Sequence, residues 1–258
     1  MNKMRSYDVF GNIALVKFPR QISLNEKKKY AQKILDNNKS VKTVLEKSGK
    51  FKGRLRKMQT NYILGEKTKE VLYRENGCVF RFNIDNVYFS TRLSNERKEV
   101  SSSIEKSDKV LVMFAGASPF SVVIAKLSGA KVFSNELNRE ANKYGKLNAE
   151  LNKVKDKIVF VDGDIKKVAK KIKEKFDVIV MPRPQLKDSF LKEAFSLSKK
   201  GTRIFYYDFC KVEEIDSIVE KVKSEAKKYK KKIEILKVKT AGEIAPYKIR
   251  VRVDFEVM

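Results

Sequence analysis

Histidine is absent from this chain of 258 residues, and cysteine occurs only twice, as Cys78 and Cys210. Without histidine there is no histidine general base, no histidine-ligated zinc and no Ser-His-Asp triad. Two cysteines are too few for a disulfide framework or for a metal site with four cysteine ligands. We therefore expect no metal centre, and two isolated cysteines without a leader sequence indicate a cytoplasmic location.

Long apolar runs are also missing. The longest uncharged stretch, residues 110–125, is interrupted by Gly116, Ser118 and Pro119. It falls short of the roughly 20 residues that a membrane-spanning helix needs. The N-terminal segment lacks the apolar region of a signal peptide. We expect a soluble protein with no membrane partner.

Acidic residues are scarce, since 32 Asp and Glu stand against 58 Lys and Arg, and the net charge is +26. Such an excess attracts nucleic acid and releases counterions when it binds. The alternative is a solvated lysine-rich surface, but in proteins of that type glutamate rises together with lysine. With 42% hydrophobic residues the chain is no disordered tail, and its length suits one large domain or two modest ones.

Residues 1–100 have the pattern of a small α+β unit. Residues 7–18 alternate in polarity around a Gly-Asn turn, which predicts a hairpin. Apolar residues at helical spacing predict a helix from residue 24 to about residue 45. A basic loop at residues 49–57 is suited either to contact a phosphate backbone or to be an ordinary solvated turn. Three short β-leaning segments follow, at residues 61–64, 70–74 and 78–83.

From residue 101 to residue 258, strands and helices alternate. Strands are predicted at residues 110–114, 131–134, 158–161, 178–181, 203–207, 234–238 and 249–256, and helices at 120–128, 138–151, 165–173, 187–198 and 213–228. This order predicts an α/β fold with a doubly wound, mostly parallel, Rossmann-like sheet. The last two strands lack an intervening helix and are expected to pair antiparallel at the edge. We place the domain boundary at residue 100, after a smaller N-terminal α+β domain that supports RNA binding.

Ligands of such sheets bind beyond the carboxyl ends of the strands. After the first strand, small residues around Gly116 let a ligand approach the backbone. Glu136 follows Gly116 by 20 residues, the spacing of a ribose-diol acceptor. Asp164, after the third strand, is suited to accept from an adenine amine. The turn lacks the G-x-G-x-x-G of dinucleotide sites, so S-adenosylmethionine fits better; the alternative is a loop that only closes the fold.

Short motifs are spread along nearly the whole chain. They are Tyr7-Asp-Val-Phe-Gly-Asn-Ile-Ala14, Glu75-Asn-Gly-Cys78, Tyr88-Phe-Ser-Thr-Arg-Leu-Ser-Asn-Glu-Arg97, Met113-Phe-Ala-Gly116 with Pro119-Phe120, Glu136-Leu-Asn138, Leu147-Asn148 and Ala245-Pro246-Tyr247. In this order they resemble the archaeal and eukaryotic tRNA (guanine-37-N1)-methyltransferases, a class I family that uses S-adenosylmethionine. The Thr-Arg-Leu at residues 91–93 favours these enzymes over the similar wyosine-pathway aminocarboxypropyl transferases, which carry Gly-Asn there.

Three positions depart from the family pattern. Val112 stands where members usually have an acidic residue, Ser118 where they have a second glycine, and Pro182 where the motif is commonly Asn-x-Pro. Many members also carry an extra N-terminal domain that grips the tRNA elbow, and we expect this sequence to begin at the domain that follows it.

The resemblance implies roles for individual residues. Arg92 is the candidate cation beside O6 of the guanine, where it would act as an oxyanion hole does; alternatively it pairs with a phosphate or with Glu96. Pro182 and Pro184 are expected to border the methyl group and the guanine, and Arg97 to reach the cofactor carboxylate. The expected cofactor-binding residues are Arg97, Phe114, Ala115, Gly116, Pro119, Phe120, Glu136, Leu137, Gly163, Asp164 and Pro182.

The expected reaction is transfer of a methyl group from S-adenosylmethionine to N1 of guanine 37 of tRNA, by a monomer that binds the anticodon stem-loop. A carboxylate must remove the N1 proton, and Glu96, Glu136 and Asp164 stay open for that role. Two alternatives also stay open. One is a wyosine-pathway enzyme that transfers an aminocarboxypropyl group or methylates the modified guanosine, and the other is a non-catalytic RNA-binding relative.

Overall fold

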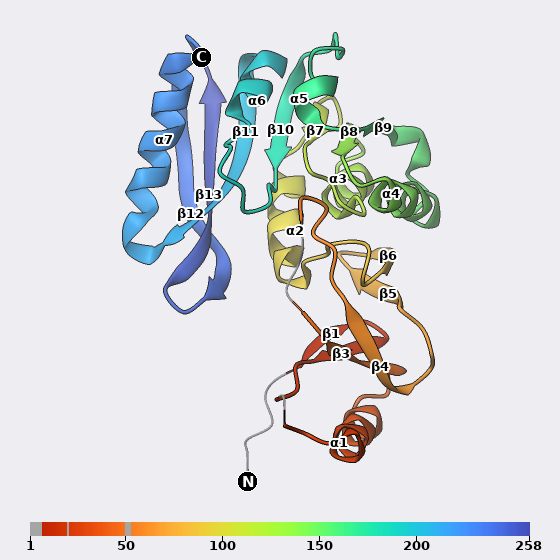
Figure 1. The fold of residues 1–258 in the computed structure, drawn as a ribbon. Helices are drawn as coiled ribbons and strands as arrows, with labels where there is room; N and C mark the ends of the chain where they lie inside the picture. The colour runs from red at the N-terminus through yellow and green to blue at the C-terminus, as the bar shows by residue number, and fades with distance from the viewer. Residues whose placement is uncertain (1–6, 20, 50–52) are drawn as a thin grey trace.

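The computed structural model describes residues 7–19, 21–49 and 53–258. In these ranges the chain forms a small N-terminal sheet, a two-stranded hairpin and a large seven-stranded sheet. Figure 1 shows the N-terminal sheet below the large sheet, with the hairpin and helix α2 (Ser94–Ser102) between them. No helix in the described part of the chain is long and apolar enough to cross a membrane.

The N-terminal sheet has the strand order β1-β2-β3-β4. Its strands are β1 (Asp8–Phe10), β2 (Ile13–Val16), β3 (Thr43–Lys47) and β4 (Thr60–Gly65). The predicted hairpin is confirmed, because β1 pairs antiparallel with β2. Ser23 and Glu26 form a capping box at the start of helix α1 (Leu24–Asn37). The basic loop predicted at residues 49–57 lies partly outside the described residues, at 50–52.

The prediction of one helix from residue 24 to residue 45 is wrong in its second half. The helix ends at Asn37, and Thr43–Lys47 is a strand that pairs parallel with β2. Val44 and Leu45 at the start of this strand are fully buried. Their spacing from the helix fits a helical period by coincidence, whereas these apolar side chains gain more by filling the core of the sheet.

The large sheet has the order β12-β13-β11-β10-β7-β8-β9. Its parallel strands are β7 (Lys109–Val112), β8 (Lys131–Glu136), β9 (Ile158–Asp162), β10 (Phe176–Met181) and β11 (Ser198–Lys211). The chain first winds from β7 outward to β9 and then returns to β10 on the other side of β7. This confirms the doubly wound fold and puts its switch point between β7 and β10, where ligands of such sheets bind.

Helices cover both faces of this sheet. One face packs on α2, α3 (Pro119–Leu127) and α4 (Arg139–Leu151) in a single apolar core. The other face packs on α5 (Ile165–Val168), α6 (Leu191–Leu197) and α7 (Ile215–Lys228). The helix predicted at residues 165–173 is much shorter than expected and ends at Val168. The lysine-rich second half of the predicted helix has little apolar surface to bury.

The last two strands, β12 (Ile233–Ala245) and β13 (Lys248–Val257), pair antiparallel as predicted. The final strand, β13, inserts between β12 and β11 and is antiparallel to both. Because of this direction, the beginning of β13 lies beside the carboxyl end of β11, with Arg250 opposite Phe209.

The hairpin of β5 (Glu70–Glu75) and β6 (Cys78–Asn83) is attached to the large sheet by Asn148 of α4 and by Asn152, the C-cap of that helix. Asn148 accepts from the backbone N–H of Arg81 at 2.7 Å and donates to its carbonyl at 3.1 Å. Asn152 pairs in the same way with the backbone of Val79. Side chains four residues apart along the helix thus meet backbone groups two residues apart along β6. Their hydrogen bonds pair the edge of this strand, which would otherwise be open.

The domain boundary at residue 100 stays a prediction.

We predict that Asn148→Ala lowers the free energy of unfolding by about 2–3 kcal/mol, because it leaves buried backbone groups of the hairpin unpaired. The Asn148 amide also donates to the carbonyl of Ala117, so the turn before α3 loses a partner as well. Chemical denaturation measures the change. Asn37→Ala, at an exposed helix end, is the control and should cost less than about 0.5 kcal/mol; equal effects of the two would contradict this account.

Candidate functional site

A pocket of about 1050 Å³, including the open space at its mouth, lies at the carboxyl ends of the parallel strands. Its wall is formed by the loops after β7, β8, β9 and β10 and by residues 54–56, 88–90 and 209. The residues expected to bind the cofactor or border the methyl group all line it: Arg97, Phe114, Ala115, Gly116, Pro119, Phe120, Glu136, Leu137, Gly163, Asp164, Pro182 and Pro184. Apolar and aromatic side chains with a few polar groups form this lining, as is typical of small-molecule sites.

The turn between β7 and α3 is unusual in its backbone. Phe114, Gly116 and Ser118 all have φ near +60°, the left-handed region. For Ser118, where a glycine was expected, this conformation costs about 1 kcal/mol, and its buried hydroxyl lies 3.0 Å from the hydroxyl of Ser134. Gly145 on α4 makes room for it, since a Cβ there would lie 2.5 Å from Ser118 Oγ. Strain of this kind is typical of ligand-binding turns.

Glu136 joins the turn after β7 to the end of β8. Its carboxylate accepts hydrogen bonds from the backbone N–H of Gly116 and of Asn138, both at 2.7 Å. Burial raises the pKa of Glu136, although these backbone donors act in the opposite direction. A carboxylate has about four acceptor positions, so this one retains capacity for donors from a ligand in the pocket.

Asp164 caps the short helix α5 and pairs with a residue of the N-terminal region. Its Oδ1 accepts from the backbone N–H of Lys166 at 3.1 Å, and its Oδ2 lies 2.8 Å from the guanidinium of Arg54. This ion pair connects residues 54–56, which line the pocket, to the start of α5.

The segment Pro182-Arg183-Pro184 closes the pocket after β10. Arg183 is buried, with its guanidinium 2.8 Å from Asp208 and donating to the carbonyl oxygens of Leu186 and Asp188. The buried arginine therefore fixes the loop that carries both prolines. Its own role was not foreseen, since the sequence pattern draws attention to the prolines rather than to the residue between them.

Arg97 lines the pocket, but its charge is already paired. The guanidinium makes a two-pronged ion pair with Glu75 at the end of β5 and donates to the carbonyl of Ser90 at 2.9 Å. This pair attaches α2 to the hairpin and stretches residues 88–90 along the pocket wall.

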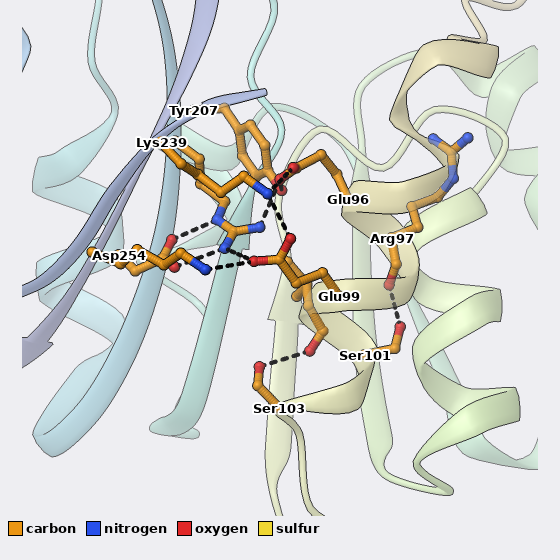
Figure 2. A network of polar contacts seen from close by, with 11 residues as sticks. Glu96, Arg97, Glu99, Ser101, Ser103, Tyr207, Lys239 and Asp254 are labelled. Atoms are coloured by element: carbon orange, nitrogen blue, oxygen red, sulfur yellow. Dashed lines mark hydrogen bonds and ion pairs between the residues drawn. The ribbon is translucent and has the colours of Figure 1, made fainter. Parts of the chain in front are cut away.

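Glu96, a candidate base, points away from the pocket. Glu96 and Arg97 lie on opposite sides of α2, and Glu96 faces the C-terminal strands together with Glu99 (Figure 2). Glu96 contacts Arg252 at 2.6 Å, Lys239 at 3.0 Å and the hydroxyl of Tyr207 at 3.0 Å. Glu96 is absent from the pocket wall, and its contacts describe a structural ion-pair network.

Arg92 also lies outside the pocket. Its side chain is 63% exposed, with its guanidinium 3.8 Å from Asp8 and 3.3 Å from the carbonyl of Glu243. These contacts connect the N-terminal hairpin to the C-terminal end of β12. The sequence analysis expected Arg92 beside the substrate base, and the described geometry leaves it at the surface.

Sequence analysis did not identify two cation–aromatic pairs in the pocket wall. The guanidinium of Arg56 lies 4.0 Å from the ring centre of Tyr88, and that of Arg250 lies 5.2 Å from the ring centre of Phe209. Arg56 belongs to the basic loop whose role was left open. No pattern in the sequence indicated Arg250, because only the antiparallel insertion of β13 brings it to the carboxyl ends of the parallel strands.

The fold and the site define a doubly wound α/β protein with a nucleoside-sized pocket at its switch point. Residues 71–236 match the family described as the TRM5/TYW2 methyltransferase domain, and residues 2–68 match the TYW2 N-terminal domain. The first match covers more than half of the chain, which therefore belongs to the TRM5/TYW2 methyltransferase family.

Individual relatives agree with this assignment. The chain is 33% identical to tRNA (guanine(37)-N(1))-methyltransferase Trm5b of Pyrococcus abyssi, over 98% of this chain and 74% of the relative. It is 31% identical to tRNA (guanine(37)-N(1))/4-demethylwyosine(37)-methyltransferase Taw22 of Nanoarchaeum equitans, over 96% of this chain and 98% of the relative. The crystal structure of the Pyrococcus abyssi protein superposes with a TM-score of 0.87, over 98% of this chain and 75% of that one.

The ion-pair network around α2 yields a stability prediction. Arg252 is buried and contacts Glu96, Glu99 and Asp254, each within 2.7 Å. Arg252→Gln removes the cation that contacts all three carboxylates, and we expect the free energy of unfolding to fall by about 3–5 kcal/mol. Denaturant unfolding measures the loss, with the exposed Arg74→Gln as control. A loss below about 1 kcal/mol would contradict a structural role for the network.

Proposed function

We propose that this chain transfers a methyl group from S-adenosylmethionine to N1 of guanine 37 in tRNA. The observation that carries the proposal is the meeting, in one pocket, of the half-buried acceptor Glu136 from the large sheet and the cation Arg56 from the N-terminal region. The first is suited to hold a ribose, and the second to stabilise negative charge on a base. Membership of the TRM5/TYW2 methyltransferase family supports the same reaction.

The residues of the pocket fit an adenosyl cofactor. Glu136 has acceptor capacity for the two ribose hydroxyls, and Leu137 and Ile165 offer apolar surface to an adenine ring. At Gly116, where φ is positive, a Cβ would lie 3.3 Å from the carbonyl oxygen of Tyr88, so a side chain there would be strained and tightly packed. When bound, the cofactor would supply an electrophilic methyl group on a sulfonium. We propose that Pro182 and Pro184 border that methyl group.

Arg56 is the proposed electrostatic catalyst. As guanine N1 gives its proton to a carboxylate of the pocket wall and attacks the methyl group, the bond from that methyl group to sulfur breaks and leaves a neutral thioether. Negative charge builds on O6 in this step, and a fixed cation nearby lowers the barrier. Arg92, assigned this role from the sequence, is at the surface, whereas Arg56 lines the pocket with its guanidinium held over Tyr88. Burial lowers the pKa of Arg56, yet an arginine remains charged at neutral pH.

The RNA part of the proposal rests on charge. A net charge of +26 attracts the phosphate backbone, and the arginines of residues 53–56 stand at the pocket. A base in an anticodon loop is already unpaired, so it enters such a pocket at low cost. A solved relative, 25% identical with a TM-score of 0.85, is described as a complex of aTrm5 and tRNALeu. We propose the anticodon stem-loop as the partner and a cytoplasmic monomer as the active form.

A second function is favoured by one relative. Taw22 of Nanoarchaeum equitans, matched over 98% of its length, is named for both guanine 37 and 4-demethylwyosine 37 methylation. We propose methylation of 4-demethylwyosine as an additional activity of the same pocket, because both substrates present a purine-derived ring to the same cofactor.

The proposed reaction is tested with S-adenosylmethionine labelled in the methyl group and tRNA transcripts that carry G or A at position 37. We expect 1-methylguanosine in the G37 transcript only, because adenine N1 has no proton to lose and adenine has no O6. Nucleoside mass spectrometry identifies the product. A tRNA with 4-demethylwyosine tests the second substrate, and cofactor labelled in the aminocarboxypropyl group tests the wyosine-pathway transferase. Label from that group in RNA, or no methylation at all, would contradict the proposal.

A further inference from the structure

Four arginines are buried among the described residues: Arg97, Arg183, Arg250 and Arg252. A guanidinium withdrawn from water is costly unless an opposite charge lies next to it. Three of the four meet that condition. Arg97 pairs with Glu75, Arg183 with Asp208, and Arg252 with a cluster of carboxylates from α2 and β13.

Arg250 is the exception. It is only 7% exposed, yet no carboxylate of the described residues lies within ion-pair distance, and its guanidinium donates to none of their oxygens. Its recorded contact is with the ring of Phe209, at 5.2 Å. A cation–aromatic contact contributes about 0.5–2 kcal/mol and leaves the charge itself unneutralised.

The surroundings of Arg250 are also cationic. Arg250 and Arg56 line the same pocket, and Arg250 contributes to lowering the pKa of Arg56, after the larger effect of burial. The acidic residues in the pocket wall are Glu136 and Asp164, and Asp164 already pairs with Arg54. The wall near Arg250 is therefore prepared for an anion that the described chain does not supply.

The position of Arg250 decides which anion fits. In the strand order, β13 is separated from β8 by β11, β10 and β7. Four strand spacings separate the two backbones by about 19 Å, so Arg250 enters the pocket at the end away from Glu136, where the ribose of the cofactor is expected. The methionine arm of the cofactor is a chain of only a few bonds and is too short to extend across this interval. The RNA substrate, by contrast, carries a phosphate on either side of the target base.

We propose that Arg250, oriented by Phe209, binds a backbone phosphate of the RNA adjacent to the base that enters the pocket. The proposal rests on the function proposed above and adds a phosphate site to it. The planar guanidinium is suited to a two-pronged contact with phosphate oxygens, and stacking on Phe209 fixes its plane before the RNA arrives. This contact would position the target nucleotide without reading its sequence.

The test compares Arg250→Gln with Lys200→Gln. Lys200 is exposed at the amino end of β11, at the edge of the sheet opposite to the pocket, and its substitution removes the same charge. The Kd of an anticodon stem-loop RNA is measured at several salt concentrations. Arg250→Gln should raise the Kd about tenfold and reduce the slope of log K against log salt by about 0.7, the value for one phosphate contact on a single strand. Lys200→Gln should change both by much less.

Two further measurements separate the alternatives. The Kd of S-adenosylhomocysteine, from calorimetry, should be the same in Arg250→Gln and in the unsubstituted protein; a weaker affinity would assign Arg250 to the cofactor carboxylate and overturn the proposal. With saturating tRNA, kcat should fall much less than kcat/KM; an equal fall in both would assign Arg250 to the reacting base and overturn it too. RNA binding that matches the Lys200→Gln control overturns it as well.

Two controls distinguish a lost phosphate contact from a misfolded variant. Arg250→Lys keeps the charge and loses the planar stack, so its RNA affinity should lie between those of the unsubstituted protein and Arg250→Gln. Thermal unfolding reports whether each variant is folded. Absence of cofactor binding and methyl transfer in the unsubstituted protein would refute the proposed function, whereas normal methyl transfer with unchanged RNA binding in Arg250→Gln would refute the phosphate site alone.

Discussion

The architecture of the pocket depends on the neutralisation of buried arginines by carboxylates. Arg97 with Glu75 attaches α2 to the hairpin, and Arg252 with Glu96 attaches the opposite side of α2 to the C-terminal strands. Arg183 with Asp208 holds the loop after β10. In a chain with a large basic excess, each such carboxylate is a scarce partner, and its position determines where a guanidinium can be buried. Together the three pairs fix the elements that surround the pocket.

The turn after β7 shows how strain is tolerated at such a site. Its alternating left-handed residues direct the backbone N–H of Gly116 toward Glu136, and the carboxylate in turn holds the turn against the end of β8. Ser118 replaces the expected glycine without disrupting the turn, because Gly145 leaves space for its hydroxyl. The departure from the family pattern is thus accommodated within the two helices that meet there.

The sequence analysis predicted the large sheet well because its central strands are buried on both faces. Such strands appear as short β-branched runs, and the residues at their carboxyl ends, such as Gly116 and Glu136, are then brought together by topology alone. Prediction was less accurate where tertiary contacts determine the secondary structure of a segment. Residues 43–47 are a strand because a parallel partner is available, and the helix after Asp164 is short because little apolar surface follows it.

The positions of the arginines at the site also depend on tertiary contacts and could not be predicted from the sequence. Arg56 and Arg250 enter the pocket from a loop of the N-terminal region and from the last strand, and nothing in local pattern relates them. Arg92 was expected there by its place in a motif, but its neighbour Leu93 takes the buried position and Arg92 faces solvent. Motif order predicts which segments converge; which side chains of a segment face the ligand depends on packing.

The account depends most on an adenosyl group whose ribose is held by Glu136. The direct measurement is the Kd of S-adenosylhomocysteine, by calorimetry, from mildly alkaline to mildly acidic pH in the unsubstituted protein and in Glu136→Gln. The ionised carboxylate is the better acceptor, and burial raises its pKa. Affinity should therefore fall as the pH drops through that raised pKa, starting above the ordinary range of a glutamate, and should be weaker and independent of pH in Glu136→Gln. Absence of binding, or equal affinity of the two proteins at every pH, would contradict the account.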